Sequence, residues 1–187
     1  MFAGAEIDAQ IIAEWRGFFG MAAGTAAGLA GLVFVALSMH QKGIRAYPPY
    51  RYRARSSLAS MMMIFVVASL VLLPRQTSAW LGLEEVVAIG AVGAYLAWSF
   101  LRAREAVTKL PLGRRFVRPY QQRTILAVGT SLVGMVGGAL VGVGSDAGFY
   151  VLAGFSLVTM VWVVINTWAL VMGITDEDAG PARSEGQ

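Results

Sequence analysis

The chain of 187 residues contains no cysteine and only one histidine, His40. The absence of cysteine excludes disulfides, thiolate metal sites, iron–sulfur clusters and a cysteine nucleophile. One histidine is too few for a multi-histidine metal cage within one subunit. We therefore expect no cofactor and no metal site. His40 follows an apolar stretch, where a cation is favourable beside the last carbonyls of a helix.

The motifs of soluble enzymes are also missing. The sequence contains no GxxxxGK[ST], no HExxH and no GxSxG. Segment 142–148 is rich in glycine, but no strand precedes it, as a dinucleotide-binding loop would require. Ser145 and Asp146 have no histidine with which to form a catalytic triad in this region. The chain is therefore not predicted to be an enzyme on its own.

Charged residues are scarce and apolar residues are abundant. Charged side chains make up 14% of the chain and hydrophobic ones 57%, whereas soluble domains average about 25% and 45–50%. The mean hydropathy is +0.62. One core of this size cannot bury that much apolar surface. The composition therefore predicts an integral membrane protein.

Five apolar stretches are long enough to cross a bilayer. Backbone groups in lipid must bond internally, so stretches of about 20 apolar residues predict transmembrane helices. The predicted helices are residues 17–39, 57–73, 80–101, 124–144 and 147–175. The predicted fold is an all-α integral membrane bundle over 1–175, with a flexible cytoplasmic tail at 176–187. Residues 144–148 form a tight turn between the last two helices, and residues 102–110 can prolong the third.

The basic residues predict the orientation. The loop after the first stretch carries five Lys and Arg and the loop after the third carries seven, which together are twelve of the fifteen in the chain. Short basic loops stay on the cytoplasmic side. We therefore expect a multi-pass protein of the cell inner membrane with its N-terminus outside and its C-terminus cytoplasmic. This bias accounts for the net charge of +4, so no nucleic-acid partner is predicted.

Arginines in these loops are predicted to contact anionic lipid headgroups on the cytoplasmic face. They are Arg51, Arg53, Arg55, Arg114 and Arg115. The alternative is a dedicated site for a phosphate-bearing ligand. Pro48 and Pro49 precede the first three, and their constrained φ favours a stiff, extended turn.

Glycines at four-residue spacing predict close helix packing. They are Gly20, Gly24 and Gly28 in the first stretch and Gly134, Gly138 and Gly142 in the fourth. Such a repeat leaves a groove that another helix backbone can approach, within the chain or between chains. A simple arrangement places the first, third and fourth helices at the centre. The bulkier second and fifth helices would then face lipid more.

Few polar residues lie at membrane depth, where they are costly and mark candidate sites. Asn166 is interpreted as a hydrogen-bonding contact between helices, with a ligand or pore contact as the alternative. Glu84 and Glu85 lie within the first turn or two of the third helix, where they complement the helix dipole and can pair with Arg75 or Arg16. In an oligomer, one of these glutamates per subunit would instead form a carboxylate ring at an outer pore mouth.

Three functions follow from these patterns. The leading one is assembly, as a homo-oligomer or as an accessory subunit of a larger membrane complex. The alternative is an oligomeric ion channel or permeation pathway with the carboxylate ring. The third is a component of an enzyme or transporter whose catalytic groups come from a partner chain. The expected partners are membrane lipids and other membrane subunits.

Overall fold

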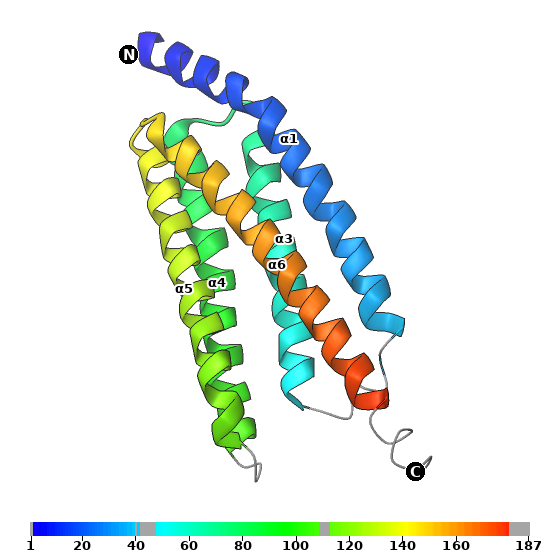
Figure 1. Cartoon of the computed structure of the whole chain (residues 1–187). Coiled ribbons are helices and arrows are strands. Elements are labelled where there is room, and N and C mark those ends of the chain that lie inside the picture. The colour runs from blue at the N-terminus through cyan, green and yellow to red at the C-terminus, as the bar shows by residue number, and fades with distance from the viewer. Residues whose placement is uncertain (1, 40, 42–47, 109–112, 180–187) are drawn as a thin grey trace, which may run out of the picture.

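The computed structural model describes the whole chain except residues 1, 40, 42–47, 109–112 and 180–187, and its described part is helical with no strand (Figure 1). The helices are α1 (Phe2–Met39), α3 (Pro48–Leu72), α4 (Ser78–Thr108), α5 (Gly113–Gly142) and α6 (Ala147–Ala179). Each contains a segment long and apolar enough to cross a membrane. These segments are Gln10–Met39, Arg51–Leu72, Ser78–Arg102, Ile125–Gly142 and Ala147–Ala169. The all-α prediction and the five long apolar helices are confirmed.

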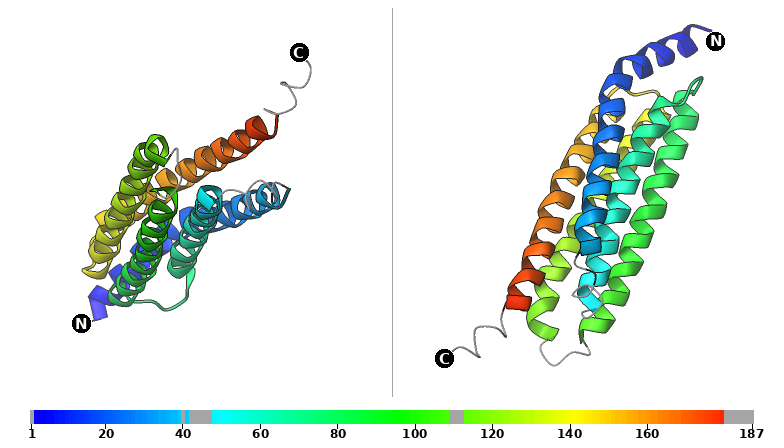
Figure 2. Two further views of the ribbon diagram at one scale, coloured as in Figure 1. Left: turned by 90° about the horizontal axis from the view of Figure 1, so that it is seen from below. Right: turned by 90° about the vertical axis from the view of Figure 1, so that its right-hand side faces the viewer.

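The bundle has two distinct ends. At one end, which we call the turn end, lie the α3–α4 and α5–α6 turns and the N-terminus (Figure 1). At the other, which we call the loop end, α1, α4 and α6 finish and α3 and α5 begin. The first turns of α1 lean across the turn end (Figures 1 and 2). Parts of the two predicted basic loops, residues 42–47 and 109–112, lie outside the described residues.

The order of the helices in the bundle differs from the prediction. Helix α3 lies between its neighbours and contacts α1, α4 and α6, while α4 and α5 form the most extensive pair (Figure 2). In the most apolar 18-residue segment of each span, 44% of the residues in α3 and 50% of those in α6 are buried, against 28% in each of α1, α4 and α5. The prediction of a glycine-rich centre with α3 and α6 facing lipid is therefore wrong.

Side-chain volume explains this order. Met61, Ile64, Val67 and Val71 of α3 are fully buried at the three- and four-residue spacing of one helix face. Met63 is buried as well, whereas Met62 between them is 52% exposed. Bulky, flexible side chains fill the space between helices. Glycine has no side chain, so it lets two helices approach closely but does not fill the space between them.

The glycines of α5 are used within the chain. A Cβ added at Gly82 of α4 would overlap the backbone of Gly142, and one at Gly138 would lie 2.9 Å from Cβ of Glu85. A Cβ at Gly134 would lie 3.1 Å from the ring of Phe155 on α6. Helix α5 therefore packs closely against α4 along one side and against α6 along another.

The α5–α6 turn forms as expected, with Gly144 in the left-handed region at φ 78°. The Ser145 N–H donates to the Leu140 carbonyl at 2.9 Å, and the Gly144 N–H donates to the Val141 carbonyl at 2.8 Å. This pair of bonds is the Schellman motif, which satisfies carbonyls at the end of a helix.

Several helix ends differ from the prediction. Helix α1 begins at Phe2 and not at residue 17, and α5 begins at Gly113 and not at residue 124. Pro48 and Pro49 begin α3 instead of forming an extended turn, because proline fits the first helical position, where no N–H is needed. Helix α6 continues to Ala179, past the predicted end at 175, while α4 reaches Thr108 as the predicted extension.

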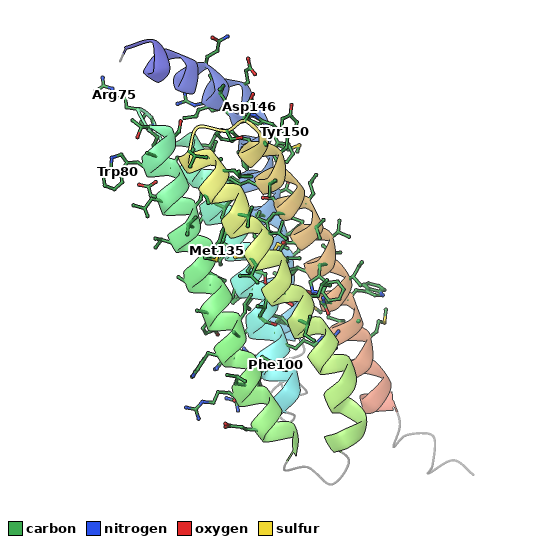
Figure 3. The ribbon with its side chains drawn as sticks, turned by 90° about the vertical axis from the view of Figure 1, so that its left-hand side faces the viewer. Arg75, Trp80, Phe100, Met135, Asp146 and Tyr150 are labelled. Atoms are coloured by element: carbon green, nitrogen blue, oxygen red, sulfur yellow. The ribbon has the colours of Figure 1, made fainter. Side chains whose placement is uncertain are left out.

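Exposed aromatic residues mark two levels along the bundle. Trp80 and Trp98 are exposed on α4, and Tyr150 and Trp168 are exposed on α6. Each pair is 18 residues apart, which is about 27 Å along an α-helix and close to the thickness of a bilayer hydrocarbon core. Trp80 and Tyr150 lie toward the turn end (Figure 3). Tryptophan and tyrosine favour membrane interfaces, so the two levels bound the apolar zone of the bundle.

Candidate functional site

A polar cavity of about 80 Å³ lies among α3, α4, α5 and α6 in the half of the bundle nearer the loop end. It is lined by Arg53, Ser56, Ser57 and Ser60 of α3, Leu96, Ser99 and Phe100 of α4, Ala127 of α5, and Trp162, Val163 and Asn166 of α6. Phe100 marks its position on α4 (Figure 3). Ser57, Ser60 and Ser99 are buried. The cavity is therefore open on one side, and buried serine residues form part of its wall.

Arg53 connects α3 to α6 at this cavity. Its Nη2 donates a hydrogen bond to the backbone carbonyl of Asn166 at 3.0 Å. Ser56 Oγ donates to the Arg53 carbonyl at 2.9 Å, and Asn166 Nδ2 donates to the Trp162 carbonyl at 2.9 Å. The interhelical bond of Asn166 thus uses its backbone, while its side-chain amide bonds within its own helix.

The three arginines of the 51–55 segment have different surroundings. Arg51 and Arg55 are exposed, whereas Arg53 is half-buried and lines the cavity. Residues four apart share a helix face, and the residue midway between them lies on the opposite side. Arg51 and Arg55 remain accessible for the predicted headgroup contacts. The side chains of Arg114 and Arg115 lie outside the described residues.

The cavity offers chemistry suited to a small anion. Arginine provides a planar array of donors, serine hydroxyls both donate and accept, and none of the described lining residues is acidic. A cavity of about 80 Å³ has room for a few water molecules or one small polyatomic group. Sequence reasoning named Arg53 and Asn166 separately, with a phosphate-bearing ligand and a ligand contact as the alternatives. It missed the serines between them, although Arg53, Ser56, Ser57 and Ser60 recur at the spacing of one helix face.

Glu85 is a second polar feature, nearer the turn end. Its side chain is 0% exposed, and neither carboxyl oxygen has a hydrogen-bond partner among the described residues. Its Cβ faces Gly138 of α5. Glu85 lies five residues beyond Trp80, or about 8 Å along the helix. A buried carboxylate without a partner is costly, so Glu85 is a candidate for proton or cation binding.

Glu84 has a different environment from its neighbour. Its Oε2 accepts a hydrogen bond of 2.6 Å from Gln76 Nε2, in the turn that precedes α4. In the part of the chain that the structure describes, neither glutamate forms the expected ion pair with Arg16 or Arg75. No group of three or more His, Cys, Asp or Glu side chains close enough to hold a metal occurs among these residues either.

A scan against protein-family models and searches of curated proteins and of solved structures found no match.

Proposed function

We propose that this chain is a multi-pass inner-membrane protein, with its N-terminus outside and its C-terminus cytoplasmic, that acts by assembly. In this proposal two copies associate through the glycine face of α1. The supporting observations are the five apolar helices, the basic loops and the unfilled groove on α1. An accessory subunit of a larger complex would use the same face against a helix of another protein.

The observation that carries the proposal is the contrast between the glycines of α1 and those of α5. A Cβ added at Gly17, Gly24, Gly28 or Gly31 of α1 would meet no atom within 4 Å, and one at Gly20 would only reach a Leu72 methyl at 4.0 Å. Three- and four-residue spacings place all five on one face of the helix. The structure therefore leaves a backbone groove open on α1.

Such a groove fits a second copy of itself. Met21, Leu32 and Phe34 are exposed on α1 and flank the glycines. Because lipid tails are as apolar as leucine, helices associate in a bilayer by close packing, which small residues allow. Two copies of one groove related by a twofold axis form a self-complementary interface. This arrangement explains why the glycines of α1 occur on an exposed face.

The channel alternative has no comparable support. Glu85 is enclosed by its own chain, so its carboxyl does not face a lumen between subunits in this conformation. Glu84 is half-buried and bonded to Gln76. We therefore do not propose the carboxylate ring as a second function.

The test is the mass of the complex after gentle detergent extraction, with every copurifying chain identified. The double variant Gly24→Leu/Gly28→Leu fills the groove, and Gly129→Leu on α5 is the control because a Cβ added there also meets no atom within 4 Å. We expect the parent and the control to be dimeric and the double variant to be monomeric with an unchanged thermal midpoint. An unchanged mass for the double variant would overturn the proposal. Loss of a different copurifying chain would assign the face to a partner subunit.

A further inference from the structure

We infer that the polar cavity and an adjoining apolar groove together bind one anionic phospholipid, with the headgroup phosphate at Arg53 and an acyl chain between α5 and α6. This inference rests on the proposed membrane residence of the chain and not on the proposed α1 contact. It assigns a particular, internal role to one of the arginines near the loop end.

The groove has the character of an acyl-chain site. It is an open groove with a volume of about 330 Å³, within the usual range for ligand sites. Its walls include Leu126, Leu157, Val158, Val161 and Ile165. Its two threonines do not make it polar. Thr130 Oγ1 donates to the Ala127 carbonyl at 3.0 Å, and Thr159 Oγ1 donates to the Phe155 carbonyl at 2.7 Å.

The groove and the cavity adjoin one another. Trp162 lines both of them, and Leu126 of the groove is next in sequence to Ala127 of the cavity. Helices α5 and α6 are close at the turn end and diverge toward the loop end, where both features lie (Figures 1 and 2). One molecule with a polar and an apolar part can therefore occupy both.

The depth of the two features matches the orientation of a lipid. Asn166 of the cavity is two residues from Trp168, or about 3 Å along α6, at the aromatic level of the loop end. Val158 of the groove is ten residues from Trp168, or about 15 Å, near the middle of the apolar zone. A lipid of the leaflet at the loop end would place its headgroup and its chain at these two levels.

Charge favours an anionic headgroup. Arg53 is the charged residue among those that line the cavity, and the described lining includes no carboxylate to accept the ammonium group of a zwitterionic lipid. A guanidinium binds phosphate oxygens through charge-assisted hydrogen bonds. The nearby serines supply further donors of the kind that phosphate accepts.

Native mass spectrometry of the full-length, delipidated protein tests the inference. Phosphatidylglycerol and phosphatidylcholine with identical chains are titrated separately. We expect tighter binding of phosphatidylglycerol, and a loss of about tenfold or more in its affinity for Arg53→Gln, since a hydrogen bond to a charged group is lost. Arg55→Gln removes the same charge from an exposed position and should change the affinity by less than about twofold. Val161→Trp fills the groove from an exposed position and should also weaken binding.

Four results would overturn the inference. Equal losses for Arg53→Gln and Arg55→Gln would show a general surface attraction, and equal affinity for the two lipids would remove the role of headgroup charge. Competition by inorganic phosphate, together with unchanged binding by Val161→Trp, would assign the cavity to a soluble anion. If Arg53→Gln does not fold, Val161→Trp decides alone, and an unchanged affinity refutes the acyl-chain site. The same spectra report the oligomer mass, so a monomer that binds phosphatidylglycerol refutes only the α1 contact.

Discussion

The contact between α4 and α5 is set by glycine on both sides, and it predicts a large effect of a single methyl group. In Gly82→Ala, the new Cβ would overlap the backbone N and Cα of Gly142 and lie 2.5 Å from the carbonyl oxygen of Gly138. All three are backbone atoms, so no change of rotamer can relieve the overlap. The two helices would have to move apart along their shared face.

The magnitude follows from the size of this displacement. Optimal contacts between non-bonded carbon atoms are about 3.5–4.0 Å, so the helices must separate by about 1 Å. Overpacking of this kind costs about 1–3 kcal/mol, and a clash with backbone belongs at the upper end. Alanine has a higher helix propensity than glycine, which offsets about 1 kcal/mol of this cost. We therefore expect Gly82→Ala to lower the free energy of unfolding by about 2 kcal/mol.

Gly129→Ala provides the matched control. A Cβ at Gly129 would meet no atom within 4 Å, so only the propensity gain applies, and we expect this variant to be as stable as the parent or more stable by up to about 1 kcal/mol. Reversible unfolding in mixed micelles, followed by tryptophan fluorescence, measures both variants. Equal stabilities for Gly82→Ala and Gly129→Ala would refute the backbone contact between α4 and α5.

Two further predictions concern the buried glutamate and the orientation. Glu85→Met replaces an unpartnered buried carboxyl with an apolar side chain of similar length and should raise the free energy of unfolding by about 1–3 kcal/mol. Glu84→Met, which removes the acceptor of the Gln76 hydrogen bond, should lower it by about 1 kcal/mol. A less stable Glu85→Met would show that the carboxyl has a stabilising partner, such as a bound cation. Because the chain has no cysteine, single cysteine substitutions report the topology. An impermeant maleimide should label Asp146→Cys in intact cells and Gln41→Cys only after lysis. The reverse labelling pattern would invert the proposed orientation.

The sequence alone determined the number, positions and helical character of the apolar segments. Each is a local property, because a backbone in lipid must satisfy its hydrogen bonds within its own helix. The turn at Gly144 was also predictable from the sequence, because a left-handed residue in the turn between two long apolar helices favours glycine. The candidate arginines, glutamates and Asn166 were also visible as polar residues beside or within apolar stretches.

Only the tertiary structure decided which faces of these helices meet. Residues that face lipid and residues that face protein are equally apolar, so hydropathy does not indicate that α3 and α6 are the most buried. The glycine repeats of α1 and α5 look alike in sequence, yet α5 packs along its repeat while the groove of α1 stays open. Packing of α3 against α6 turns Arg53 inward, between two exposed arginines. A side chain's role here depends on which neighbouring helix lies against it, and close packing in a medium as apolar as the protein selects that neighbour by shape.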